Sequence, residues 1–149
     1  MNELNKIEVL LVEDNPNDAE LALRSLKKHN LANHVHWVKD GAEALECLFG
    51  NGADTPLPCM NDYMKLILLD LKMPKVNGME VLRKVKSDPK TSSIPVVVMT
   101  SSNDDRDIDD CYKLGANSYI TKPVEFEKFA RIVADLGLYW LILNENPLK

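Results

Sequence analysis

Five chemically reactive side chains stand at the ends of short apolar runs in this sequence. They comprise three carboxylates, one hydroxyl and one amine: Glu13, Asp14, Asp70, Thr100 and Lys122. Carboxylates held close together repel one another unless a cation lies among them. All-oxygen ligation with room for water suits magnesium better than zinc, which prefers histidine or cysteine. If these positions converge in the fold, they predict a magnesium site.

Asp70 is the natural nucleophile of such a site, because a carboxylate can form an acyl phosphate. The metal ion would neutralise the site and hold the oxygens of an incoming phosphoryl group. Lys122 would pair with a phosphoryl oxygen as a point charge, and Thr100 would donate a hydrogen bond to another. Plainer roles stay open: Asp14 could only cap the next helix, Lys122 could lie on the surface, and Thr100 could simply end a strand.

The apolar pattern predicts the elements that must position these residues. Strands are predicted at 7–12, 35–38, 66–69, 96–99 and 118–121, and helices at about 15–29, 42–49, 79–86, 104–114 and 125–143. Asn15 or Asn17 would cap the first helix, and residues 51–65 are predicted as a loop. This alternation is typical of α/β domains with right-handed βαβ units and a parallel sheet covered on both faces. The carboxyl ends of the strands lie along one edge of such a sheet, so the five candidates should meet there.

The bulk composition is that of one globular domain spanning residues 1–149. A formal net charge of −5 provides no basic surface for nucleic acid or an anionic membrane. The three cysteines are odd in number and show no CxxC spacing, which disfavours a disulfide framework and a structural zinc site. The sequence predicts neither a signal peptide nor a membrane span, and therefore a cytoplasmic protein.

Four motifs, in this order and spacing, resemble the signature of the response-regulator receiver domain of two-component signalling. They are VLLVEDN, LLDLKMP, VVVMTSS and YITKP. The resemblance spans about residues 4–136 and implies a flavodoxin-like fold with strand order 2-1-3-4-5. It also implies that Asp70 is phosphorylated by a sensor histidine kinase, with Glu13 and Asp14 as the acidic pair that binds Mg²⁺.

The same resemblance implies roles for five further positions. Thr100 would be the switch hydroxyl, Lys122 the site lysine, and the backbone carbonyl of Lys72 would complete the metal ligands. Pro123 would follow a cis peptide bond, which costs little before proline. Tyr119 would rotate inward when Thr100 moves towards the phosphate, although packing on a strand is the plainer reading of an aromatic residue.

A long loop before the third strand and an extension at residues 137–149 resemble the single-domain regulators that serve phytochrome-type sensor kinases in bacteria. No effector domain follows, so we expect signalling through protein–protein contacts, and catalysis only of the chain's own phosphorylation and dephosphorylation. The resemblance places the output on the fourth helix, fifth strand and fifth helix, which could also form a homodimer. The apolar extension could complete the core, form a dimer face or contact the kinase.

Three other functions share parts of this pattern. A phosphatase of the haloacid dehalogenase kind wants a second aspartate two positions after the nucleophile, where this chain has Lys72. A flavodoxin-like FMN carrier needs a hydroxyl-rich or glycine-rich phosphate loop, whereas EDNPND offers repelling carboxylates. A degenerate receiver that acts only as a scaffold does not need intact acidic, hydroxyl and lysine positions. The pattern therefore favours the phosphorylation switch.

Overall fold

The computed structural model describes residues 8–28, 34–50, 66–73, 76–101 and 104–122. Strands and helices alternate along the chain in the order β1 (Val9–Val12), α1 (Pro16–Lys28), β2 (Val35–Val38), α2 (Gly41–Phe49), β3 (Leu66–Leu69), α3 (Gly78–Ser87), β4 (Val96–Thr100), α4 (Asp105–Leu114) and β5 (Ser118–Thr121). All neighbouring strands pair in parallel, and their order is β2-β1-β3-β4-β5. The predicted fold class and strand order are confirmed.

Some predictions concern parts of the chain outside the described residues. These are the loop at 51–65, the final helix at about 125–143, the cis bond before Pro123 and the extension at 137–149. Within the described ranges, no helix has the length and apolar character needed to cross a bilayer.

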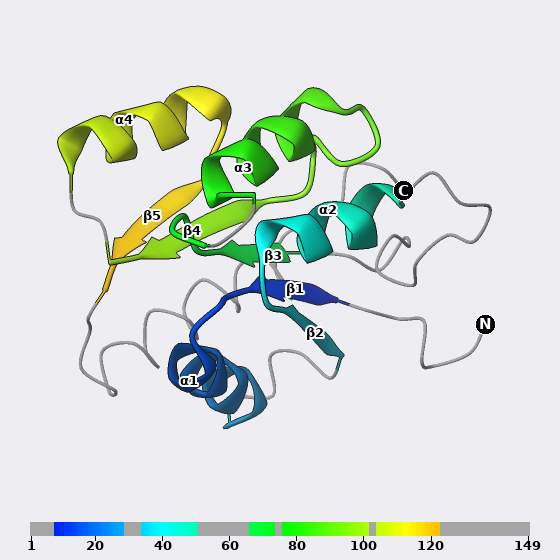
Figure 1. Cartoon of the computed structure of the whole chain (residues 1–149), viewed down its shortest axis with the longest axis vertical. Helices are drawn as coiled ribbons and strands as arrows, with labels where there is room; N and C mark the ends of the chain where they lie inside the picture. The colour runs from blue at the N-terminus through cyan, green and yellow to red at the C-terminus, as the bar shows by residue number, and fades with distance from the viewer. Residues whose placement is uncertain (1–7, 29–33, 51–65, 74–75, 102–103, 123–149) are drawn as a thin grey trace.

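The sheet separates two apolar cores (Figure 1). Helices α2, α3 and α4 cover one face, and α1 lies on the other. Successive side chains of a strand point to opposite faces, so Leu10 and Val12 pack into the core beneath the three helices, while Val9 and Leu11 pack towards α1. Because both faces are covered, β1 and β3 are buried throughout and consist of continuous apolar residues.

Polar side chains begin the helices close to the predicted positions. The Oδ1 atom of Asn15 accepts hydrogen bonds from the backbone amides of Asn17 at 2.8 Å and Asp18 at 3.2 Å. Asn15, rather than Asn17, therefore caps α1. Asp40 caps α2 and Asn77 caps α3 in the same way.

Two glycines allow the loop after β3 to pack against the starts of two helices. A Cβ atom on Gly78 would overlap the carbonyl oxygen of Asp70, and one on Gly41 would overlap that of Val76. Both positions lack space for any side chain, so the path of the chain beyond Asp70 depends on them.

Two cysteines of the described region differ in state. Cys111 is a buried free thiol on α4, whereas Cys47, buried in α2, is disulfide-bonded. The odd cysteine count argued against a framework of several disulfides, and among the described residues Cys47 is the one cysteine that is disulfide-bonded. Spacing along the chain did not predict this bond.

Candidate functional site

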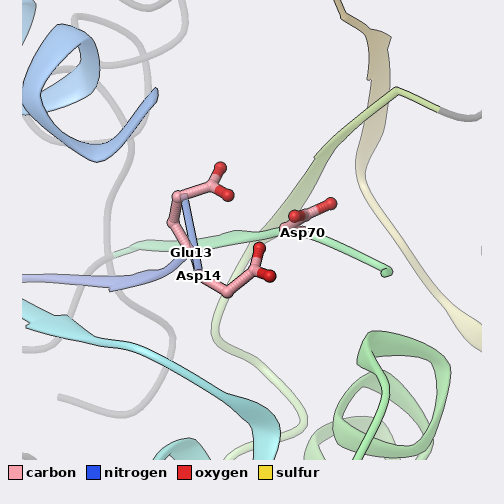
Figure 2. Close-up of side chains that lie close together, drawn as sticks. All are labelled: Glu13, Asp14 and Asp70. Atoms are coloured by element: carbon pink, nitrogen blue, oxygen red, sulfur yellow. The ribbon is translucent and has the colours of Figure 1, made fainter. Parts of the chain in front are cut away.

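The predicted acidic residues meet at the carboxyl-terminal edge of the sheet. Glu13 and Asp14 directly follow β1, Asp70 directly follows β3, and one oxygen from each lies within 4.8 Å of the other two. Figure 2 shows the three side chains gathered where these strands end. Backbone hydrogen bonds from Glu13 to the carbonyl of Val38 (3.1 Å) and from Asp70 to that of Val12 (3.0 Å) extend the strand pairing beyond the strand ends. The sheet itself therefore holds these two carboxylates in place.

Burial makes negative charge costly at this site. Glu13 is 2% exposed and Asp70 is 7% exposed, whereas Asp14 is exposed. Burial raises the pKa of Glu13 to about 7, although Lys122 acts in the opposite direction. Burial also raises the pKa of Asp70, against the opposing effect of Lys122. A hard divalent cation would favour the ionised forms of both groups, so the donor set fits such an ion.

Lys122 provides the positive charge of the site. Its Nζ atom donates to Glu13 Oε1 at 2.6 Å and to Asp18 Oδ2 at 2.9 Å, and lies 4.0 Å from Asp70 Oδ2. Its backbone amide donates to the carbonyl of Thr100, which ties the lysine to the end of β4. Burial opposes the ammonium charge, but the hydrogen bonds to Glu13 and Asp18, with the nearby charges, outweigh it and raise the pKa of Lys122.

Thr100 and Lys72 flank the nucleophile. The side chain of Thr100 is fully buried, and its hydrogen bond with Asp70 favours the ionised carboxylate, as does the backbone of Lys72. The amide of Lys72 lies 3.4 Å from Asp70 Oδ1, while metal ligation by its carbonyl stays a prediction. Tyr119 is partly buried against the core beneath α2, α3 and α4, and its rotation also stays a prediction.

The site also contains residues that the sequence patterns did not predict. Asp18 binds Lys122, and the indole Nε1 of Trp37 donates to the backbone carbonyl of Glu13 at 2.7 Å. The backbone amide of Asn15 donates to Glu13 Oε2 at 3.2 Å. Asp18 had a usable signal, because an acid in the first turn of the helix after the acidic pair lies close to the same strand end. Trp37 had none, because its contact depends on the pairing of two strands.

These side chains surround an open cavity of about 290 Å³. Every residue that lines it is of a polar or charged type: Glu13, Asp14, Asn15, Asp18, Asp70, Lys72, Ser101 and Lys122. A water molecule occupies roughly 30 Å³ in the liquid, so this cavity has room for a phosphoryl group together with a hydrated cation.

Comparisons with known proteins agree with this geometry. The family model described as the response regulator receiver domain matches residues 9–134. The probable methanogenesis regulatory protein FilR2 of Methanothrix harundinacea is 39% identical over 140 residues, which is 93% of this chain and 86% of the relative. Response regulator Rcp1 of Synechocystis sp. is 35% identical over 89% of this chain and 88% of its own length.

Two solved structures resemble the whole described fold. The phosphorylated cyanobacterial phytochrome response regulator RcpA superposes with a TM-score of 0.82 at 37% identity, covering 95% of this chain and 98% of its own. The Mn²⁺-bound form of Rcp1 superposes with a TM-score of 0.80 at 34% identity, covering 95% and 99%.

Proposed function

The chain belongs to the response-regulator receiver family, and from this premise we propose that a sensor histidine kinase phosphorylates it on Asp70. The observation that carries the proposal is the meeting of buried Asp70 with two other carboxylates and Lys122 at one edge of the sheet. The phosphorylated state of RcpA supports it. Family membership also favours this function over the phosphatase and the FMN carrier considered above.

The proposed reaction moves a phosphoryl group without any redox change. A carboxylate oxygen of Asp70 attacks the phosphorus of a phosphohistidine, and an O–P bond forms as the P–N bond breaks. The electron pair of the P–N bond leaves with the imidazole nitrogen of the kinase. Lys122 pairs with one phosphoryl oxygen, and Thr100 donates a hydrogen bond to another. The receiver acts only on its own side chain.

Glu13, Asp14 and Asp70 are the residues that would hold Mg²⁺, together with the backbone carbonyl of Lys72. When bound, the ion supplies positive charge that neutralises the carboxylates and the phosphoryl oxygens. The shared donor set of three carboxylates supports this assignment, and the Mn²⁺-bound form of Rcp1 supports a divalent cation in a relative.

Incubation with acetyl phosphate and Mg²⁺ tests the proposal. We expect the wild-type protein to gain the mass of one phosphoryl group, to lose it in alkali or hydroxylamine, and to gain none when Mg²⁺ is chelated. Asp70→Asn should gain none under any condition, while Asp110→Asn, which removes an exposed carboxylate on α4, should behave as wild type. Phosphate on Asp70→Asn, or none on the wild type, would contradict the assignment.

We propose a phytochrome-type kinase as the partner, which RcpA supports by its description as a phytochrome response regulator. FilR2, at a similar identity, is a probable methanogenesis regulatory protein, so a direct comparison of kinases tests this choice. Purified phytochrome-type and other histidine kinases should be compared for the rate of phosphotransfer to this chain. A faster transfer from the other kinases would contradict this choice.

The output surface is proposed to include α4 and β5, through which the phosphorylated chain would contact a target protein or a second copy of itself. We propose no nucleic-acid or membrane partner, and a cytoplasmic location. Sedimentation before and after phosphorylation would test homodimer formation, and an unchanged sedimentation coefficient would contradict it.

A further inference from the structure

The ammonium of Lys122 is held by two carboxylates that flank the nucleophile. We propose that Asp18 is a positioning residue. It holds the ammonium of Lys122 out of hydrogen-bond range of Asp70, so that the ammonium pairs with a phosphoryl oxygen and not with the attacking carboxylate. This inference rests on the proposed phosphorylation of Asp70 and assigns a role to a residue outside the predicted site.

The distances around the ammonium carry the inference. Nζ of Lys122 lies within hydrogen-bond range of Glu13 at 2.6 Å and Asp18 at 2.9 Å, but 4.0 Å from Asp70. An ammonium has three donors, so these two carboxylates occupy two of them and leave one for a further oxygen. The separation from Asp70 is beyond a direct hydrogen bond, and a phosphoryl oxygen attached to Asp70 would enter that gap.

Asp18 is the hydrogen-bond partner that Lys122 would keep when a cation is bound at the site. Glu13 belongs to the carboxylate trio that would bind the cation, whereas Asp18 stands outside it. Cation binding would therefore weaken the hold of Glu13 on Lys122 and leave that of Asp18 intact. Without Asp18, attraction at a 4.0 Å separation would draw the ammonium onto Asp70, because the lysine side chain is only 10% exposed and little water competes. A direct ion pair would cover the attacking oxygen and lower its reactivity.

The local structure places Asp18 for this role. It lies in the first turn of α1, where its backbone amide donates to the capping Asn15, and where the helix dipole favours a negative charge. Glu13, directly after β1, and Asp18, in the first turn of α1, lie only five positions apart, so one short segment sets both contacts of the ammonium.

Four proteins test the inference by their rate of phosphorylation with acetyl phosphate and Mg²⁺. Asp18→Asn keeps the side-chain shape but removes the charge, and we expect it to react roughly fivefold more slowly, the scale of losing one charge-assisted hydrogen bond at a partly exposed site. Asp18→Glu restores the carboxylate, and at 32% exposure the longer side chain has room to adjust, so it should recover most of the rate. Glu20→Gln is the matched control, because this α1 carboxylate pairs only with exposed Arg24 among the contacts of the described region.

The outcomes separate positioning from a structural role. The expected result is a slow Asp18→Asn protein with the same unfolding midpoint as wild type, rescue by Asp18→Glu, and a wild-type rate for Glu20→Gln. A wild-type rate for Asp18→Asn, a failed rescue, an equal loss in Glu20→Gln, or a rate loss matched by lower stability would each overturn the inference. If the wild-type protein itself accepts no phosphate, the proposed function fails instead.

Discussion

At the scale of single residues, the site concentrates negative charge where solvent is excluded. Asp70 is 7% exposed, and Glu13 and Asp14 each place an oxygen within 4.8 Å of its carboxylate. Lys122 offsets part of this charge, but among the contacts in the described residues its ammonium donates hydrogen bonds only to Glu13 and Asp18. These buried charges should lower the free energy of unfolding of the ligand-free protein, and they favour the binding of a charged ligand.

Asp70→Asn should stabilise the protein in the absence of divalent cations, because it removes one of the crowded carboxylates. We expect a gain of about 1 kcal/mol, which is roughly 3 °C in the unfolding midpoint of a domain of this size. Added Mg²⁺ should raise the midpoint of the wild type, and that of Asp70→Asn much less, because binding to the folded state adds to stability. Thermal unfolding measured by circular dichroism would check both shifts. With Asp110→Asn as the control, a lower midpoint for Asp70→Asn would count against charge crowding.

Cys111 should make stability depend on alkaline pH. Burial, with the negative charges of Asp107 and Asp110, raises the pKa of its thiol from 9.0 to about 11. Between these values the unfolded chain loses the thiol proton first, so the stability of the native state falls as pH rises. At two pKa units the loss is at most about 2.7 kcal/mol. Urea unfolding under argon at about pH 8 and pH 10.5 should show a smaller pH effect in Cys111→Ala than in wild type; equal pH effects would refute this role.

The acids of the site were predictable because each ends or follows a buried strand, and parallel strands end at one edge. The contact between Asp18 and Lys122 joins positions 104 residues apart. The position of an acid in the first turn of α1 indicates that Asp18 lies near the strand end, but no periodicity or motif predicts its pairing with Lys122. The hydrogen bond from Trp37 to the Glu13 carbonyl was also not predictable, since it depends on the register in which β2 pairs with β1.

At the scale of elements, the side chain of Lys86 links α3 to the sheet through hydrogen bonds. The Nζ atom of Lys86 donates to the carbonyls of Ser92 at 3.1 Å and Ile94 at 2.8 Å, and lies 3.4 Å from Asn117 Oδ1. Asn117 in turn accepts a hydrogen bond from the backbone amide of Val96 at the start of β4. One lysine therefore links the end of α3 to the segments that enter β4 and β5, at the opposite end of the strands from the acidic site.

Lys86→Met should destabilise the fold without blocking the site. The variant keeps an apolar stem of similar length but loses the donors, and we expect a cost of roughly 1–3 kcal/mol because the facing carbonyls lose their partner. Lys84→Met, an exposed lysine on the same helix, should cost little. Urea denaturation of both variants would check the difference, and equal stabilities would show that the Lys86 contacts contribute nothing.

The bounds of the elements were largely predictable, because β2, β3 and β5 have the predicted limits and the helices differ by one or two residues. Their end signals are local: a capping side chain, a glycine or a proline. The tight approach of Gly41 and Gly78 to the loop after β3 was not predictable, since it depends on how three segments pack.

At the scale of the whole molecule, the site lies at one edge of a sheet whose two faces carry separate apolar cores. Its residues contact the end of β4 through Thr100, and Thr100 pairs in register with Thr121 of β5. Among the hydrogen bonds of the described residues, those that link the site to β2 are the backbone bond from Glu13 to Val38 and the indole contact of Trp37. A change at Asp70 should therefore spread mainly towards β4, α4 and β5.

Hydrogen exchange with and without beryllium fluoride, a mimic of the phosphoryl group, would test this direction. In the presence of Mg²⁺ we expect altered amide protection in β4, α4 and β5, and little change in α2, because a bistable element must contact the group that biases it. Asp70→Asn is the control and should show no ligand effect. Equal changes across all helices would contradict a directed response.

The indole Nε1 of Trp37 lies 2.7 Å from the Glu13 carbonyl oxygen, so Trp37 is an intrinsic fluorescence probe of the acidic site. Filling the acidic cluster alters the electric field at that ring, so emission from a Trp140→Phe protein follows occupancy in real time without dye or label. The rates at which ligands bind and leave the site can then be measured by stopped-flow fluorescence.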